Sequence, residues 1–115
     1  MVEIPLQPIP SQELQVILDG QNCTVSVYWR FWKLYMDLLV DSEPVFTGAV
    51  CQNMQWVNQS PSPVFSGGMM FVDALGEEAP RWDGLGSRWS LLYLDAEEAK
   101  DPQAAARAML EEVQP

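Results

Sequence analysis

The sequence contains no histidine and only six lysines and arginines among its 115 residues. Without histidine it lacks the usual general base at neutral pH and the commonest metal ligand of proteins. Sixteen aspartates and glutamates give a formal net charge of −10, which repels the phosphates of nucleic acids and anionic lipid surfaces. These deficits disfavour an ordinary hydrolase, a zinc enzyme, a nucleic-acid-binding protein and a polybasic membrane-binding protein.

Cysteines and long apolar runs are also scarce. Two cysteines, Cys23 and Cys51, are too few for a disulfide scaffold or a thiolate metal site. Residues 1–5 lack the basic start and apolar run of a signal peptide, and no apolar stretch approaches the ~18 residues of a membrane span. We therefore expect a single domain, made in a reducing cytoplasm, with both thiols free.

Hydrophobic residues nevertheless make up 48% of the chain, and many of them alternate with polar residues. A period of two is typical of antiparallel strands with one buried face. It predicts strands within residues 14–18, 23–28, 34–40, 45–51, 69–73 and 89–95. Asp19-Gly20, between the first two, is a strong hairpin signal. No helical period interrupts the series, so the sequence predicts an all-β fold, a small antiparallel sandwich or barrel of about six strands.

The N-terminal segment, residues 1–12, differs from the β domain predicted for residues 13–95. Three prolines within Ile4–Pro10 prevent helix formation and favour an extended arm. Ile4, Leu6 and Ile9 make this arm partly apolar, so we expect it to lie along its own sheet or along that of a neighbour. A stiff arm loses little entropy on docking. We expect a chain without residues 1–10 to fold but not to assemble.

The C-terminal segment, residues 96–115, is acidic and has a helical period. Asp101-Pro102 supplies an N-cap followed by a first-turn proline, and strong helix formers dominate Gln103–Val113. This pattern predicts a short C-terminal helix that needs a surface to pack on.

No catalytic or cofactor motif stands out. Residues 84–88, Gly-Leu-Gly-Ser-Arg, could form a phosphate cradle, but a nucleotide loop lies between a strand and a helix, whereas here a strand follows. We interpret this segment as a tight turn with Arg88 in a structural ion pair. Cys51 has no histidine partner, and the paired glutamates are adjacent and point apart. We predict a protein without catalytic residues, bound metal or cofactor, and not an enzyme.

Aromatic residues are the informative excess, with five tryptophans, three tyrosines and four phenylalanines. Trp29, Phe31 and Trp32 surround Arg30 and Lys33 in one connection. Exposed clusters of aromatic residues and arginine concentrate binding energy at protein interfaces. The candidate interface residues are Ile4, Leu6, Ile9, Trp29, Arg30, Phe31, Trp32, Trp56, Phe65, Trp82 and Arg88. Two alternatives remain open: a carbohydrate- or peptide-binding module that uses its tryptophan-rich loops, and rings that all belong to the core.

Several sequence blocks, in order along residues 4–93, resemble the phage baseplate plug family of contractile-tailed phages. The blocks are Ile4-Pro5-Leu6-x-Pro8-Ile9-Pro10, Leu18-Asp19-Gly20-Gln21-x-Cys23, Leu34-Tyr35-x-Asp37-Leu38, Pro44-Val45-x-x-Gly48-Ala49-x-Cys51, Phe71-Val72-Asp73-x-x-Gly76 and Gly84-Leu85-Gly86-Ser87-Arg88-Trp89-x-Leu91-Leu92-Tyr93. The aromatic run at residues 29–32, residues 55–68 and the tail after Asp95 depart from the pattern, so no partner contacts carry over to them.

The resemblance implies a non-enzymatic structural virion protein in the hub region of the tail baseplate, assembled in the host cytoplasm. Its implied partners are other tail proteins (tube, hub and spike), with no nucleic acid, membrane or cofactor. Tail geometry implies several copies per baseplate, in a threefold or sixfold arrangement.

Overall fold

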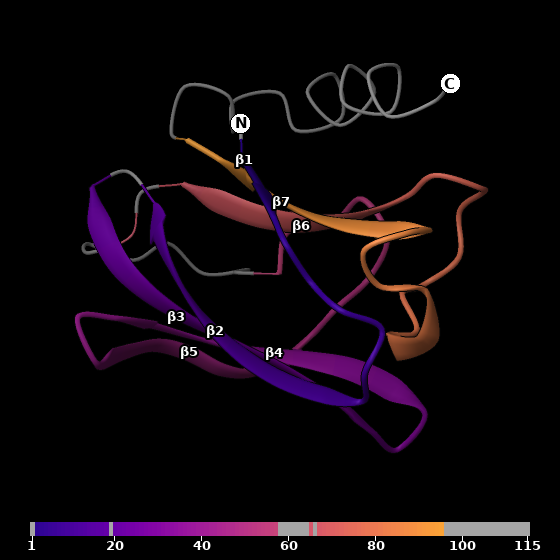
Figure 1. Ribbon diagram of the computed structural model, residues 1–115, viewed down its shortest axis with the longest axis horizontal. Coiled ribbons are helices and arrows are strands. Elements are labelled where there is room, and N and C mark those ends of the chain that lie inside the picture. Colours follow the sequence, from indigo (N-terminus) through magenta and orange to yellow (C-terminus); the bar gives the residue numbers. More distant parts are fainter. Residues whose placement is uncertain (1, 19, 58–64, 66, 96–115) are drawn as a thin grey trace.

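The computed structural model describes residues 2–18, 20–57, 65 and 67–95. These residues form seven β-strands and one turn of 3-10 helix, and the strands make two antiparallel sheets (Figure 1). The strands are β1 (Val2–Ile4), β2 (Ser11–Leu18), β3 (Gln21–Arg30), β4 (Lys33–Val40), β5 (Glu43–Val50), β6 (Gly68–Asp73) and β7 (Trp89–Leu94), and the 3-10 turn is η1 (Trp82–Gly84).

The larger sheet has the order β2-β3-β4-β5, in which each strand pairs with the next one along the chain. Alternating residues of β3 and β4 point into the protein, and Val25, Val27, Met36 and Leu38 are almost fully buried. The period of two in the sequence therefore corresponds to one buried face of this sheet.

The smaller sheet has the order β1-β7-β6 and is apolar on both faces. Phe71 and Leu91 point into the main core between the sheets. Met70 and Leu92 belong to a second buried cluster, against which Met54 and Trp56 pack. Strands buried on both faces have near-continuous hydrophobic sequences, which explains why alternation is weak in β6 and β7.

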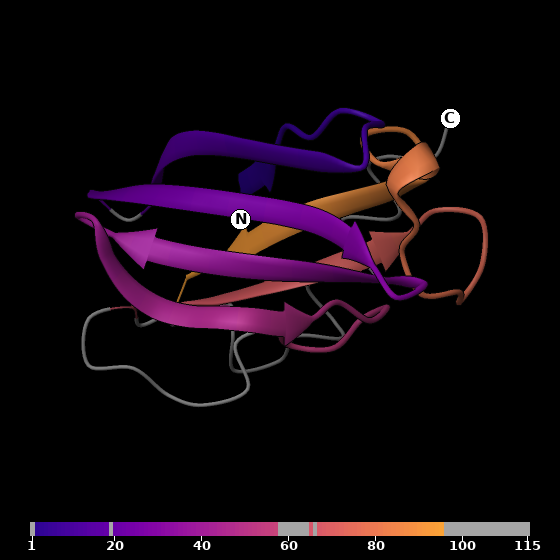
Figure 2. The same ribbon diagram turned by 90° about the horizontal axis from the view of Figure 1, so that it is seen from below.

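The two sheets face each other across one hydrophobic core, so the fold is a sandwich and not a barrel (Figure 2). All six predicted strands are confirmed. The seventh, β1, lies within the predicted N-terminal arm and pairs Val2 with Tyr93 and Ile4 with Leu91.

The proline-rich segment is part of the fold of its own chain. Ile4 is 1% exposed and Leu6 is 7% exposed, and both belong to the main core cluster. Of the two positions expected for the arm, its own sheet is the one that β1 occupies. Removal of residues 1–10 would take these side chains out of the core, which argues against the expectation that the shortened chain folds. The predicted acidic tail and C-terminal helix, at residues 96–115, lie outside the described residues.

Candidate protein interface at the β3–β4 turn

The turn between β3 and β4 consists of two bulky aromatic residues in a strained backbone conformation. Arg30 pairs with Lys33, so Phe31 and Trp32 alone make the turn. Their φ angles are 52° and 64°, in the left-handed region that tight two-residue hairpins require and that Asn-Gly fills best. A bulky residue in this region is a conformational outlier that costs about 1–3 kcal/mol. Phe31 is 80% exposed and Trp32 is 88% exposed, so core packing does not offset the strain.

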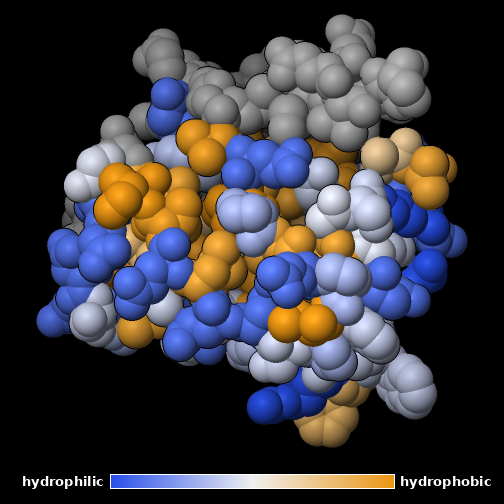
Figure 3. Space-filling view, in the orientation of Figure 1, coloured by the Kyte–Doolittle hydropathy of each residue, from blue (hydrophilic) through white to orange (hydrophobic). Residues whose placement is uncertain are grey.

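The charged residues beside this turn are also unfavourably placed for stability. Arg30 and Lys33 are direct cross-strand partners, and like charges in that position destabilise a hairpin. The Arg30 guanidinium lies 5.2 Å from the centre of the Tyr28 ring. Neither basic side chain forms an ion pair with the part of the chain that the structure describes. Both therefore present positive charge next to exposed aromatic rings. The β3–β4 turn lies at the lower end of the molecule in the orientation of Figures 1 and 3.

A hollow of about 400 Å³ lies beside the turn. One wall comes from the larger sheet, and the other comes from the segment that connects β6 to β7. Its lining residues are Trp29, Trp32, Lys33, Leu34, Val50, Cys51, Gln52, Glu78, Ala79, Pro80 and Arg81. The hollow therefore combines tryptophan and aliphatic surface with two cationic groups and one carboxylate.

Asp73, at the end of β6, anchors the wall that the β6–β7 connection provides. Its side chain is fully buried, and its carboxylate accepts hydrogen bonds from the backbone N–H groups of Leu75 (2.9 Å) and Glu78 (3.0 Å). The Arg88 guanidinium donates two more, each at 2.8 Å. These hydrogen bonds, led by those from Arg88, outweigh burial and lower the pKa of Asp73 to about 2. The predicted structural ion pair of Arg88 is confirmed.

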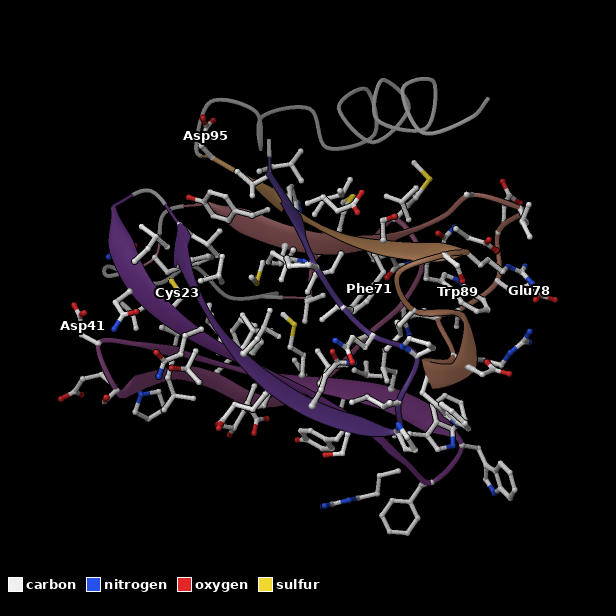
Figure 4. The ribbon with its side chains drawn as sticks, viewed as in Figure 1. Cys23, Asp41, Phe71, Glu78, Trp89 and Asp95 are labelled. Atoms are coloured by element: carbon white, nitrogen blue, oxygen red, sulfur yellow. The ribbon has the colours of Figure 1, made fainter. Side chains whose placement is uncertain are left out.

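Trp89, at the start of β7, also anchors the segment that connects β6 to β7. Its indole N–H donates to the Glu78 carbonyl at 3.1 Å, and the Arg81 and Arg88 guanidinium groups lie 5.1 and 4.5 Å from its ring centre. Glu78 and Trp89 lie at the same end of the sandwich (Figure 4). A Cβ on Gly84 would come within 2.3 Å of the Trp89 ring, so this close contact requires glycine.

The basic residues that the structure describes lie at this end of the molecule. The basic residues in the described part of the chain are Arg30, Lys33, Arg81 and Arg88. Two of them line the hollow, one lies at the turn and one supports the hollow's wall. Arg81 and Arg88 form ion pairs with Glu78, Asp83 and Asp73, whereas Arg30 and Lys33 pair with no described carboxylate. The uncompensated positive charge is therefore at the β3–β4 turn, where it favours an acidic partner surface.

The structure brings only some of the sequence-derived interface residues together. Arg30, Phe31 and Trp32 form the turn, Trp29 lines the hollow, and Arg88 supports its wall. The remaining candidates lie elsewhere: Ile4, Leu6 and Phe65 are buried in the core, Trp82 packs against it, Trp56 packs on the second cluster, and Ile9 is exposed.

Sequence reasoning missed Lys33, Pro80 and Arg81 as parts of this site. Lys33 directly follows the aromatic residues in the sequence, and this position beside the turn is the signal that could have identified it as part of the site. Pro80 and Arg81 lie about 50 residues away from the turn, and only the tertiary fold brings them to the same hollow.

The two cysteines are buried and are not activated as nucleophiles. Burial raises the pKa of both Cys23 and Cys51, so these free thiols stay protonated at neutral pH. Over residues 2–57, 65 and 67–95, except residue 19, no group of three acidic or cysteine side chains could hold a metal ion. Within the same residues, no helix is both long and hydrophobic enough to cross a membrane. What the site offers is exposed aromatic surface beside positive charge, which is suited to binding another macromolecule.

Comparison with known proteins identifies a family. A family model described as "Cyanophage baseplate Pam3 plug gp18" matches residues 1–97. A search of curated proteins finds no match. The matched range includes every described residue, and so includes both the β3–β4 turn and the hollow.

Proposed function

Because the chain belongs to the cyanophage baseplate plug family, a family of structural phage proteins of the tail baseplate, we propose that it joins neighbouring baseplate proteins through the β3–β4 turn. The turn and the adjacent hollow contact the tube and hub proteins. The protein acts by binding and positioning its neighbours, and it carries out no chemical reaction.

The observation that carries this proposal is the combination of strain and exposure at Phe31 and Trp32. Strained backbone persists where a functional requirement offsets its cost. The free protein gains nothing from two bulky rings in left-handed conformations in water. A partner that buries both rings gains a large rigid apolar area, which gives a contact a long residence time.

Charge supports the same conclusion and specifies the partner surface. Arg30 and Lys33 flank the rings without an ion pair to any described residue. A neighbour with carboxylates around an apolar pocket would satisfy both the rings and the cations. Complementary charges of this kind orient the encounter between two proteins and select the correct partner.

The proposal places the protein in the virion tail baseplate, after assembly in the host cytoplasm. It predicts several copies in each baseplate, in the threefold or sixfold arrangement that tail geometry implies. The net charge of −10 keeps the free subunit soluble before its neighbours bind it.

Co-expression with the tube and hub proteins of the same phage tests this function. The wild-type chain should elute with one of them in size-exclusion chromatography, and the Arg30→Ala/Lys33→Ala variant should elute separately. A matched control is Thr47→Glu/Gln55→Glu, which changes the net charge by the same amount at exposed positions outside the hollow. If the double alanine variant co-elutes like the wild type, the cationic turn is not the contact.

The tryptophans beside the hollow also allow a test of the carbohydrate-binding alternative. Trp32 is exposed enough to report on a bound sugar through its fluorescence. We expect no saturable change in the fluorescence of the isolated protein when cell-surface sugars are added. Saturable quenching that is lost in Trp32→Ala would instead favour the binding module.

A further inference from the structure

Strand β2 is an outer strand of the larger sheet, and its outer edge pairs with no other described strand (Figure 2). It pairs without interruption with β3 from Ser11–Tyr28 to Leu18–Gln21. Its eight residues contain no proline, no lysine and one charged residue, Glu13. Natural proteins protect exposed edge strands with prolines, bulges or lysines. β2 has none of these, so it is a template for pairing with a further strand.

The hydrogen-bonding pattern shows which backbone groups of β2 are available. Pro10 accepts a hydrogen bond from the Trp29 N–H at 2.8 Å, and Leu18–Gln21 closes a two-residue hairpin. The even-numbered residues of β2 therefore bond to β3, and the odd-numbered residues direct their N–H and C=O groups outward. These outward groups, at Ser11, Glu13, Gln15 and Ile17, make no hydrogen bond to another described backbone group.

The side chains along this edge are also incompletely covered. Leu14 and Val16 are half-buried, whereas their cross-strand partners Val25 and Cys23 on β3 are 0% exposed. The four side chains point to the same face of the sheet, so the difference reflects the missing neighbour on the outer side of β2. Ile17, on the other face, is 65% exposed.

The other edges of the described sheets do not offer a regular partner. β5 carries two register irregularities against β4, begins with Glu43-Pro44 and contains Gly48 at φ 65°. β1 spans only three residues, and the outer edge of β6 is occupied, because the Met54 and Val57 N–H groups donate to the Phe71 and Met69 carbonyls. Among the described strands, β2 of a second copy is therefore the one regular edge available to β2.

We infer that two copies of the protein associate by antiparallel pairing of β2 with β2, giving one continuous eight-stranded sheet. The register follows from the outward groups: Ser11 pairs with Ile17, and Glu13 pairs with Gln15, of the other copy. Each pair exchanges two backbone hydrogen bonds. This register uses all four outward residues and keeps the two Glu13 side chains from facing each other directly.

The same register is self-complementary in its apolar side chains. Leu14 lies on the twofold axis and faces Leu14 of the other copy in a non-hydrogen-bonded pair, the geometry in which cross-strand side chains are closest. The two half-buried leucines cover each other. A symmetric pair is an isologous contact and closes on itself, so it predicts an even number of copies, which fits six in a baseplate and not three.

Disulfide cross-linking tests both the contact and its register. In Leu14→Cys the two new cysteines would face each other with Cα atoms about 4.5 Å apart, within the range that a disulfide spans. We expect mild oxidation to cross-link this variant into a dimer. Gln12→Cys, a half-buried position on the same strand and face whose β3 partner is Val27, is the control; it would face Val16 of the other copy and remain uncross-linked. Equal cross-linking of both variants, or of neither, would overturn the proposed register.

Analytical ultracentrifugation of variants without added cysteines gives a second test that does not depend on oxidation. Gln15→Lys places a cation opposite Glu13 and should tighten the dimer about fivefold, whereas Gln15→Glu should weaken it about fivefold. The same substitutions at Thr24, its neighbour on β3, should change nothing. A wild-type protein that stays monomeric up to about 1 mM would overturn the inference.

Failure of this test is distinguishable from failure of the proposed function. The dimer is measured on the isolated protein through β2, whereas the proposed contact with tube and hub proteins is measured in co-expression through the β3–β4 turn. A monomeric protein that still binds a tube or hub protein would overturn the pairing of β2 alone.

Discussion

The Arg88 guanidinium holds the buried Asp73 carboxylate with two hydrogen bonds of 2.8 Å, across fifteen residues of sequence. This pair closes the connection between β6 and β7, whose residues Glu78 to Arg81 form one wall of the hollow beside the β3–β4 turn. The pair therefore links the fold to the interface, because it positions the wall that lies beside the β3–β4 turn.

Removing the charge of Asp73 should destabilise the protein strongly. In Asp73→Asn the partly buried Arg88 loses its buried carboxylate partner and keeps only the exposed carboxylate of Glu78, and such a loss costs about 3 kcal/mol. Asp83→Asn is the control, because Asp83 is exposed and lies 3.9 Å from Arg81, and it should cost about 0.5 kcal/mol or less. Urea unfolding followed by tryptophan fluorescence measures both. Equal effects of the two substitutions would contradict the role of Asp73.

Acid should remove the contribution of Asp73 to the free energy of unfolding within a defined range of pH. Its pKa is about 2 in the folded protein and 3.8 in the reference state, so folding favours the ionised carboxylate. The resulting stability, about 2 kcal/mol, is fully present above about pH 4 and is lost as the pH falls through about 2. The difference in unfolding free energy between wild type and Asp73→Asn should narrow over this range. A difference that stays constant down to pH 2 would exclude this linkage.

The strain at the β3–β4 turn predicts an unusual stabilising variant. Phe31→Asn/Trp32→Gly replaces two bulky residues with the pair that best fits the left-handed turn, and should raise the free energy of unfolding by about 1–3 kcal/mol. Asp41→Asn/Ser42→Gly changes the equivalent β4–β5 turn, with φ angles of 50° and 68°, where smaller residues carry less strain. The increase in the free energy of unfolding should therefore be smaller in this second variant. Thermal unfolding of both variants compares the two increases.

Burial of the N-terminal strand predicts that its loss weakens the fold. Ile4→Ala should cost about 2–4 kcal/mol, because the side chain is 1% exposed within the core. Ile9→Ala, in the same proline-rich segment, should cost less than about 1 kcal/mol, because Ile9 is 41% exposed. Chemical unfolding of the two variants separates them. Equal costs would mean that the segment is not packed as described.

Local sequence patterns account for the parts of the fold that depend on neighbouring residues. Alternation located β3 and β4 because their buried and exposed faces repeat every two residues, and Asp19-Gly20 located the first hairpin. The pairing of β1 with β7 could not be inferred, because it joins residues almost ninety positions apart and the prolines conceal a three-residue strand.

The candidate interface was only partly predictable for similar reasons. The rings around Arg30 identified the β3–β4 connection, because they are adjacent in the sequence and can be recognised without the fold. The backbone strain at Phe31 and Trp32 could not be foreseen, since two-residue turns of this type normally contain asparagine and glycine. Phe65 carried no signal that separates a core ring from an interface ring, and it packs edge-on against Tyr93.

The most direct test of the account is the number of plug subunits in particles made with the Phe31→Asn/Trp32→Gly protein. A phage that lacks its own copy of this chain would be complemented with the wild type, with this variant or with Asp41→Asn/Ser42→Gly, and purified tails would be quantified by mass spectrometry. We expect normal incorporation of the wild type and the Asp41/Ser42 variant, and near-complete loss of the Phe31/Trp32 variant despite its greater stability. Wild-type amounts of the Phe31/Trp32 variant in the particles would contradict it.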